Sequence, residues 1–551
     1  MTVGQHRLDT WSVVTGVSFF LLGVLLLVPL GKLLWASVVE EGGGLTLRHY
    51  AEFLGRPYYS RTIGHSFLVS SLVTLSALVL AVPLAWLVAR VDVPGKPLLR
   101  TLVILPLVSP PFIGAYSWIL LLGRAGYVTQ AFQAWGIRLP TVYGMHGIVL
   151  ALTLNLYPLA FLLVLSGLMA IDASLDEAAE GLGSTRWRVL RTVTLPVTLP
   201  SILSGALLVF LAAFADFGAP MIIGEGYQVL PTIVYSLFVD EMGGTPSKAS
   251  TAATLLVACT TALLLLQWWL VGRKRYAMVQ LKPAPPVRPR PGVRWLLTAC
   301  AYLVVGVSLA PAAVVAITSF FEARGPVLYP HFSLGNYREV LFNVPRAIGN
   351  SFFLSGLSTL VDVALGTLIA YLVVRRRSAA TAALDSTVML PYAIPGTVIG
   401  VAYIVAFNTP PVVLTGTFLI LVLAYVVRRL PYSVRAGAAI LHQIDPAVDE
   451  ASVSLGVPPV RTFLKVTARL MAPGIVSGAI LTWVQTITEI SATIFLYVAA
   501  WSTMTVVIYR QVSSSNFGSA AAAATLLLVA VFVPVLAVNW AMGDRAVADV
   551  S

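Results

Sequence analysis

Charged residues that lie within long apolar stretches of this 551-residue chain include Asp216, Arg428, Arg429 and Glu489. Asp216 and Glu489 are 273 residues apart. An unpaired charge inside a bilayer costs at least ~2.5–3.5 kcal/mol, so we expect these side chains to face a cavity or one another. Two interpretations stay open. The four groups form a gate or transient substrate station on a transport pathway, or they form a fixed ion pair that only orients helices.

A polar segment occurs twice, in each case about twenty residues before one of the two acids, or roughly 30 Å along a helix. Residues 177–196 read EAAEGLGSTRWRVLRTVTLP, and residues 450–469 read EASVSLGVPPVRTFLKVTAR. Small side chains allow a short helix to seat in a cleft, glycine allows a sharp turn, and basic residues can meet acidic groups of a partner. An ordinary loop with basic residues is the alternative. The candidate docking residues are Glu177, Ala178, Ala179, Gly183 and Arg186, with Glu450, Ala451, Gly456 and Arg461 in the second copy.

The composition predicts an all-α membrane protein. Hydrophobic residues make up 58% of the chain and charged residues 11%, against about 25% charged in soluble domains. Several apolar runs exceed the ~20 residues of a membrane-spanning helix and are too long for barrel strands. The net charge of +12 lies mostly in short loops on one side, which is typical of cytoplasmic loops and does not indicate nucleic-acid binding.

About twelve spans are predicted, arranged as two pseudosymmetric six-helix halves of parallel topology. RTIGHSF (61–67) matches RAIGNSF (346–352) at an offset of 285, which falls to 273 between the polar segments, so the loop near 123–146 carries about twelve extra residues. Loop charges place both termini in the cytoplasm. The predicted spans are 11–39, 62–90, 98–122, 147–171, 199–224, 248–271, 294–320, 347–374, 384–407, 411–441, 473–500 and 517–541.

Prolines interrupt the third and ninth predicted spans, near Pro110 and Pro395. Broken helices are tolerated where they line a pathway, although kinks that only improve packing are the alternative. The histidines are too scattered for a stable metal site, and the two cysteines lie in apolar spans, so neither a metal centre nor a disulfide is expected. No Ser/His or His/Asp constellation suggests a catalytic site.

The duplicated segment resembles the cytoplasmic signature of binding-protein-dependent ABC importer permeases. The match consists of Glu177-Ala178-Ala179, Gly183 and Leu195-Pro196; the second copy has Ser452 and Ala468-Arg469 where the family has Ala and Leu-Pro. The whole chain looks most like the fused, double-length permeases of ferric iron uptake. That subgroup's features are FADFGAPMIIG (214–224), LPYAIPGTVIG (390–400), YVVRRLPYSVRAG (425–437) and ITEISATIFLY (487–497).

The resemblance implies the type I ABC importer permease fold. It implies a first half at 1–272 with a coupling segment at 172–198, a basic proline-rich linker at 273–293, and a second half at 294–551 with a coupling segment at 445–472. Two ATP-binding cassette subunits and an extracytoplasmic substrate-binding protein are the implied partners, in the bilayer of a bacterial inner membrane. The chain lacks a GxxxxGK[ST] phosphate loop, so ATP and Mg²⁺ are expected on the partners and no cofactor or enzymatic activity on this chain.

The cargo implied by the resemblance is ferric iron, delivered by the binding protein and moved by alternating access. Permeases for phosphonates and other organic phosphates share much of the vocabulary, and the Arg428-Arg429 pair favours an anion or an anion-complexed metal. A secondary transporter with two six-helix halves is a further alternative, but that class gives no reason for a duplicated docking signature.

Overall fold

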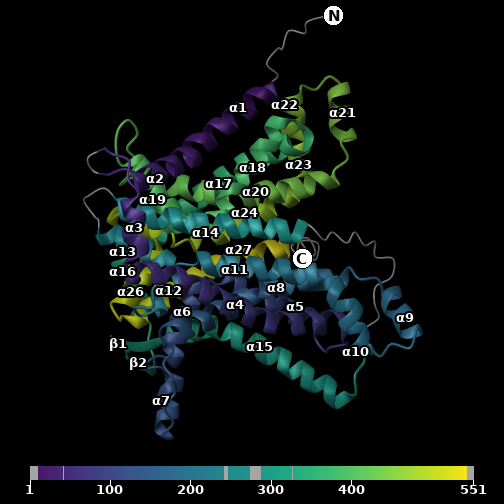
Figure 1. Cartoon of the computed structure of the whole chain (residues 1–551), viewed down its shortest axis with the longest axis vertical. Coiled ribbons are helices and arrows are strands. Elements are labelled where there is room, and N and C mark those ends of the chain that lie inside the picture. The colour runs from purple at the N-terminus through teal and green to yellow at the C-terminus, as the bar shows by residue number, and fades with distance from the viewer. Residues whose placement is uncertain (1–9, 41–42, 241–245, 273–286, 326, 543–551) are drawn as a thin grey trace, which may run out of the picture.

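The computed structural model describes residues 10–40, 43–240, 246–272, 287–325 and 327–542, and these are helical almost throughout (Figure 1). Apolar runs form helices because a helix pairs its backbone N–H and C=O groups internally. Lipid offers these groups no hydrogen-bond partners. The helices of the first half are α1 Thr10–Leu22, η1 Gly23–Leu27, α2 Val28–Val38, α3 Arg48–Gly55, α4 Pro57–Arg90, α5 Lys96–Ile104, η2 Leu105–Val108, α6 Pro111–Leu122, α7 Tyr127–Ala134, α8 Met145–Met169, α9 Ala173–Gly181, α10 Arg186–Val189, η3 Leu190–Thr194, α11 Leu195–Ala215, α12 Gly218–Ile223, α13 Leu230–Asp240 and α14 Ser247–Gly272.

The second half contains matching helices and one short antiparallel hairpin, β1–β2, which the all-α prediction did not include. Its elements are α15 Pro291–Thr318, β1 Phe321–Arg324, β2 Val327–Phe332, α16 Gly335–Asn343, α17 Pro345–Arg375, α18 Ala379–Ala393, α19 Gly396–Phe407, α20 Phe418–Gln443, α21 Ala447–Ser454, α22 Pro459–Thr462, η4 Phe463–Thr467, α23 Ala468–Leu470, α24 Ala472–Ile487, α25 Thr493–Leu496, η5 Ala499–Trp501, α26 Met504–Ser513 and α27 Phe517–Met542.

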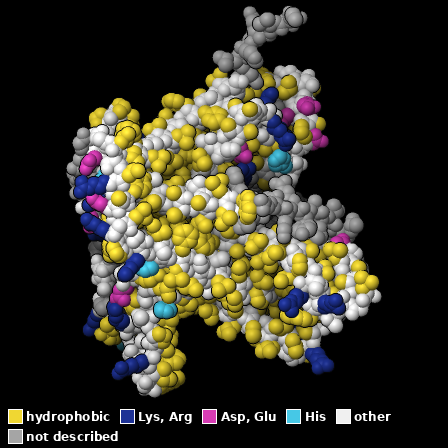
Figure 2. Space-filling model, in the orientation of Figure 1, with side chains coloured by type: hydrophobic (Ala, Val, Ile, Leu, Met, Phe, Trp, Pro, Cys, Tyr) yellow, Lys and Arg dark blue, Asp and Glu magenta, His cyan; other side chains and the backbone are white. Residues whose placement is uncertain are grey.

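The described helices agree with a multi-pass membrane protein. Eight are long and apolar enough to cross a bilayer, and up to eleven spans result if each of three bent helix pairs counts as one. α20 is as long as these spans but carries three arginines, and with it every predicted span has a counterpart. Figure 2 shows hydrophobic side chains across the middle of the face, with charged side chains gathered toward its left and right edges. A belt of this kind fits a bilayer between two polar ends.

The two halves repeat the same elements at the offsets predicted from the sequence. α6 and α19 correspond at an offset of 285, whereas α8 and α20 begin 273 residues apart. The twelve extra residues lie in the loop between α6 and α8, where they include α7. The prediction of an insertion at 123–146 is therefore confirmed.

The first span of each half packs against helices of the other half. α1 and α2 pack against α17, α18 and α19, while α15 packs against α6 of the first half, and the two lie at opposite ends of the view (Figure 1). The Tyr403 hydroxyl donates to the Leu25 carbonyl at 2.8 Å, and the Ser117 hydroxyl donates to the Pro311 carbonyl at 2.8 Å. The halves are thus sequence repeats that share one buried core.

Breaks occur at the predicted prolines. The helices on either side of Pro110 meet at 96°, and those on either side of Pro395 meet at 108°. Proline removes a backbone donor and cannot continue the preceding turn, which explains both bends. The breaks lie at equivalent positions of the two halves, so they bring the starts of α6 and α19 into the interior.

The linker prediction is only partly within the described residues, because 273–286 lie outside them, as do residues 1–9 and 543–551 of the two termini. Val287 pairs with the first half: its amide donates to the Arg90 carbonyl at 2.7 Å, and its carbonyl accepts from the Asp92 amide at 3.0 Å. Arg294 forms an ion pair with the Asp92 carboxylate at 3.3 Å. The start of the second half is therefore fastened to the end of α4.

α17 and α20 pack closely at Gly366. A Cβ added at this glycine would lie 2.4 Å from the Ser433 Cβ and 3.1 Å from the Ser433 carbonyl carbon. Glycine is needed here so that the two backbones can approach. Gly349 lies on the same helix, and a Cβ there would meet nothing within 4 Å.

We predict that Gly366→Ala destabilises the protein by about 1–3 kcal/mol, because the added methyl group forces the two helices apart. Gly349→Ala is the matched control and should leave stability unchanged or raise it slightly, since alanine favours the helix. Unfolding midpoints of the purified chain in nanodiscs measure both. Equal midpoints for the two variants would contradict the close approach.

Candidate translocation site

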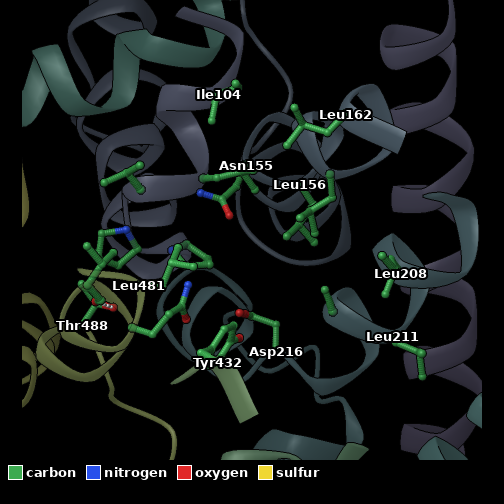
Figure 3. Close-up of a pocket in the computed structure, with 18 of the residues that line it drawn as sticks. Ile104, Asn155, Leu156, Leu162, Leu208, Leu211, Asp216, Tyr432, Leu481 and Thr488 are labelled. Atoms are coloured by element: carbon green, nitrogen blue, oxygen red, sulfur yellow. Dashed lines mark hydrogen bonds between the residues drawn. The ribbon is translucent and has the colours of Figure 1, made fainter. Parts of the chain in front are cut away.

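A cavity of about 1300 Å³ lies between the two halves. It begins near Lys96 and Met169, at the end of the molecule that carries the coupling segments, and reaches Asp216 and Glu489 deep in the interior. Figure 3 shows Asn155, Asp216, Tyr432 and Thr488 around this space among leucines of α8, α11 and α24. The broken helices line it as well, through Pro110, Pro111, Pro391 and Pro395.

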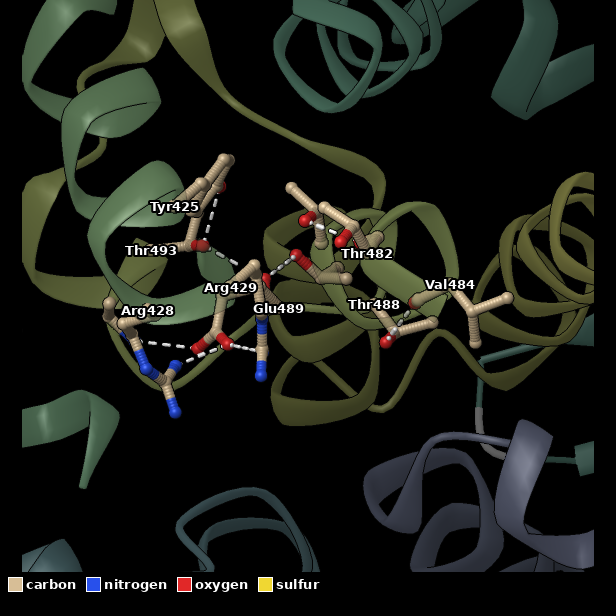
Figure 4. Close-up of polar contacts among 11 residues, drawn as sticks. Tyr425, Arg428, Arg429, Thr482, Val484, Thr488, Glu489 and Thr493 are labelled. Carbon is tan, nitrogen blue, oxygen red and sulfur yellow. Dashed lines mark hydrogen bonds and ion pairs between the residues drawn. The ribbon is translucent and has the colours of Figure 1, made fainter. Parts of the chain in front are cut away.

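Glu489 forms ion pairs with both Arg428 and Arg429 (Figure 4). All three side chains are nearly buried, with 3% of the Glu489 side chain exposed and 14% and 10% of the two arginines. Each lines the cavity. Burial of a charge is tolerated when an opposite charge compensates its lost hydration, and here one carboxylate compensates two guanidinium groups.

Asp216 lines the same cavity, but among the described residues it forms no ion pair with either arginine. Its Oδ1 accepts a hydrogen bond from the Ala219 amide at 2.9 Å. Glu489 does the same in the second half, accepting from the Ala492 amide at 3.0 Å. The acids at the repeat offset thus share one local contact, because each accepts a hydrogen bond from the amide three residues further on, in the turn that leads to the next short helix.

The predicted spans 199–224 and 473–500 are not continuous helices. α11 ends at Ala215, and α24 ends at Ile487, so Asp216 and Glu489 lie in breaks that directly follow these helices. Apolar residues continue on both sides of each break, so the hydropathy pattern does not indicate where the helix ends. The four charges are brought to one cavity, but they are unequally paired.

Aromatic side chains close the space beyond the two acids. Phe217 and Phe495 lie 6.5 Å apart between ring centroids, and Tyr235 and Phe238 contact Phe495 at 5.5 and 5.3 Å. Phe217 is fully buried. These residues come from both halves, so the aromatic cluster joins them on the side away from the coupling segments. The sequence analysis did not identify it.

The two coupling segments have the same local fold. Each consists of a short helix, a glycine with positive φ, a second short helix and a π-helical turn. Gly183 has φ +81° and Gly456 has φ +84°, a conformation that favours glycine. Ala178 and Ala179 lie in α9, and Arg186 begins α10; Glu450 and Ala451 lie in α21, and Arg461 lies in α22. The side chains of Glu177 and Arg186 are outside the described part of the structure.

An exposed leucine precedes each of these glycines. Leu182 is 89% exposed and Leu455 is 84% exposed. The two coupling segments thus present large apolar side chains to solvent at equivalent positions. The sequence analysis overlooked them, although the Leu-Gly pair occurs in both copies.

The segments differ where their sequences differ. In the first half, Trp187–Ala215 is a single span, whereas in the second half Pro459–Leu470 and Ala472–Ile487 meet at 73°. The bend follows Ala468-Arg469, which stand where the first copy has Leu195-Pro196. The departure from the repeat pattern therefore coincides with a different exit from the segment.

A buried ion pair ties the second segment to the membrane helices. Arg375, at the end of α17, lies 3.2 Å from the Asp449 carboxylate, which also accepts a hydrogen bond from the Thr467 hydroxyl. Arg90 ends α4 at the equivalent position and is 7% exposed. The two arginines are 285 residues apart, which is the offset between α6 and α19.

The described residues contain no cluster of three or more His, Cys, Asp or Glu side chains that could hold a metal ion. Asp216 and the Glu489–arginine cluster instead provide charged groups in a cavity wall that is otherwise largely formed by apolar side chains. An arrangement of this kind suits transient contact with a polar solute rather than tight chelation.

Duplicated coupling segments, broken helices and a cavity between two repeats define the class of membrane transport permeases. The chain belongs to the family described as the binding-protein-dependent transport system inner membrane component, which matches residues 81–276 and 362–542. It therefore has the type I ABC importer permease fold, in a double-length form.

Similar proteins include the ferric transport system permease protein FbpB of Actinobacillus pleuropneumoniae, 28% identical over 93% of this chain and 76% of its own length. The putative ferric transport system permease protein FbpB 1 of Haemophilus influenzae is 28% identical over 85% of this chain and 75% of its own. The molybdenum transport system permease protein ModB of Escherichia coli is 34% identical over 38% of this chain and 93% of its own.

We predict that Glu489→Gln destabilises the chain by about 3–5 kcal/mol, because it leaves two adjacent buried arginines without a carboxylate. Asp216→Asn is the matched control from the other half. It keeps an oxygen that accepts from the Ala219 amide and breaks no ion pair, so its cost should be much smaller. Unfolding of both variants in nanodiscs measures the difference, and an equal cost would contradict the unequal pairing.

Proposed function

We propose that this chain is the translocation subunit of an ATP-driven importer in a bacterial inner membrane. Two ATP-binding cassette subunits dock on the coupling segments, and an extracytoplasmic binding protein delivers solute at the opposite face. The observation that carries the proposal is the pair of exposed Leu-Gly turns at one end of a cavity that both halves enclose. In this orientation both coupling segments and both termini are cytoplasmic.

The conformation supports alternating access. The cavity reaches the coupling-segment end, and the aromatic cluster around Phe495 closes the other end. A solute therefore leaves toward the cytoplasm in this state. Movement of the halves relative to each other has to part Phe217 from Phe495 before solute enters from outside.

Ferric iron is the proposed cargo, on the strength of relatives that are named as ferric transport permeases and align with most of the chain. Four basic side chains but only two acidic ones line the cavity: Lys96, Arg100, Arg428 and Arg429 against Asp216 and Glu489. This surplus of positive charge favours iron that travels with an anionic ligand. It also keeps an anionic cargo, such as an organic phosphate or an oxyanion, as the second candidate.

Uptake by the reconstituted importer tests the cargo. The chain is assembled in liposomes with its ATPase subunits and binding protein, and uptake of radiolabelled ferric citrate, a phosphonate and molybdate is compared. We expect saturable iron uptake that requires ATP. Uptake of an anion without iron would replace the cargo, and uptake driven by an ion gradient without ATP would indicate a secondary transporter.

We predict that Gly183→Ala combined with Gly456→Ala lowers capture of the ATPase subunits roughly tenfold or more. A residue other than glycine costs about 1–2 kcal/mol in the left-handed conformation, so each segment would shift from its docking shape. Gly181→Ala is the control, since Gly181 lies two residues away with ordinary φ and open space around it. Co-purification measures the effect, and equal capture by all variants would rule out this role of the turns.

A further inference from the structure

Asp362 is a buried acid that the cavity does not use. It lies in the middle of α17, is 0% exposed, and does not line the cavity. Among the described residues neither of its carboxylate oxygens has a hydrogen-bond partner. Burial of an ionised carboxylate in a membrane helix costs free energy unless a basic group is within reach. We therefore expect such a group on the neighbouring helix.

The stripe of α17 that carries Asp362 faces α20. Ser358, Asp362 and Gly366 are spaced four residues apart and lie on one face of the helix. The Ser358 hydroxyl lies 3.5 Å from the Val422 carbonyl, and Gly366 abuts Ser433. Asp362 therefore lies between these two contacts, at the level of α20 that includes Arg429.

At that level of α20, Arg429 has a side-chain nitrogen that donates no hydrogen bond to any described residue. One terminal nitrogen binds Glu489, whereas its Nε has no hydrogen-bond partner in the described part of the chain. Arg429 lies four residues before Ser433 and thus on the same face of α20 as the residue that abuts Gly366. A buried donor and a buried carboxylate thus face the same helix interface, and each lacks a hydrogen bond there.

The charge balance gives the pairing a reason. Glu489 alone compensates Arg428 and Arg429, which leaves one positive charge in excess beside the cavity. The first half has no such cluster, because Ala77, Asn155 and Leu156 stand at the positions equivalent to Asp362, Arg428 and Arg429. An ionised Asp362 would balance that excess charge.

We propose that Asp362 is a second partner for Arg429, and that Arg429 transfers from Glu489 to Asp362 when the halves move. In the present conformation Arg429 holds Glu489 at the cavity wall. In the other conformation Asp362 withdraws Arg429 into the α17–α20 interface, so that Glu489 keeps only Arg428. Asp362 is then a positioning residue, and this exchange rests on the proposed transport function.

A double-mutant cycle on the chain alone tests the pairing without any cargo. Asp362→Asn is made in the wild-type chain and in Glu489→Gln, and unfolding is measured in nanodiscs. We expect little change in the wild-type background. In Glu489→Gln, where Arg429 has lost its partner, we expect Asp362→Asn to shift the unfolding equilibrium at least tenfold further. Additive effects would overturn the pairing. If Glu489→Gln does not fold, Glu489→Asp serves as the background.

Turnover of the assembled importer tests the exchange. Asp362→Asn should lower the maximal uptake rate at least tenfold with unchanged half-saturation by the binding protein, and Asp362→Glu should restore part of it. Ser358→Ala, one turn away on the same stripe, is the control and should transport normally. Wild-type turnover of Asp362→Asn would overturn the exchange. Failure of the wild-type chain to transport would instead contradict the proposed function, while the unfolding cycle would still decide the pairing.

Discussion

A helix can end inside a membrane only if the backbone groups that it exposes find partners in the protein, and this constraint shapes the centre of the molecule. α11 and α24 both end there, and both times the next residues place an acid whose oxygen accepts from an amide three residues on. Each of these hydrogen bonds fixes the turn between a long helix and the short helix after it, α12 or α25. The two acids that line the cavity are therefore held by side-chain hydrogen bonds at equivalent positions.

Asp216 and Glu489 place ionisable groups in the membrane interior. The polar residues around these two acids differ between the halves. In the second half Glu489 is held by Arg428 and Arg429, and Gly396 leaves the room that the Arg428 guanidinium occupies. In the first half Asn155 replaces Arg428 and donates instead to the Pro106 and Ser109 carbonyls at the helix break. Duplication thus preserved the backbone while the polar chemistry of the two halves diverged.

The sequence reveals features that depend on local pattern, and misses those that depend on helix rotation. The length of the apolar runs predicts the spans, and Pro110 and Pro395 predict the bends. The offset between the repeated sequence motifs predicts the insertion that contains α7. The ends of α11 and α24 could not be predicted, because the apolar pattern continues through Phe217 and gives no signal of the turns in which Asp216 and Glu489 lie. The sharing of Glu489 by two arginines depends on which way α20 is turned. So does the exposure of Leu182 and Leu455, because periodicity in a short polar segment does not define an outer face.

The coupling segments and the charged cluster lie at opposite ends of the same helices. These helices therefore connect the two sites mechanically. α11 is 21 residues long, or about 31 Å at 1.5 Å per residue, and joins the first segment to Asp216 without a bend above 40°. In the second half the 73° bend separates segment from helix, but Arg375 binds Asp449 and so joins the segment to α17. Displacement of the second segment therefore acts on α17 as well as on α24. Because α17 packs along α20, which carries both arginines, a displacement of the second segment would reach Glu489 through α24 and through α20.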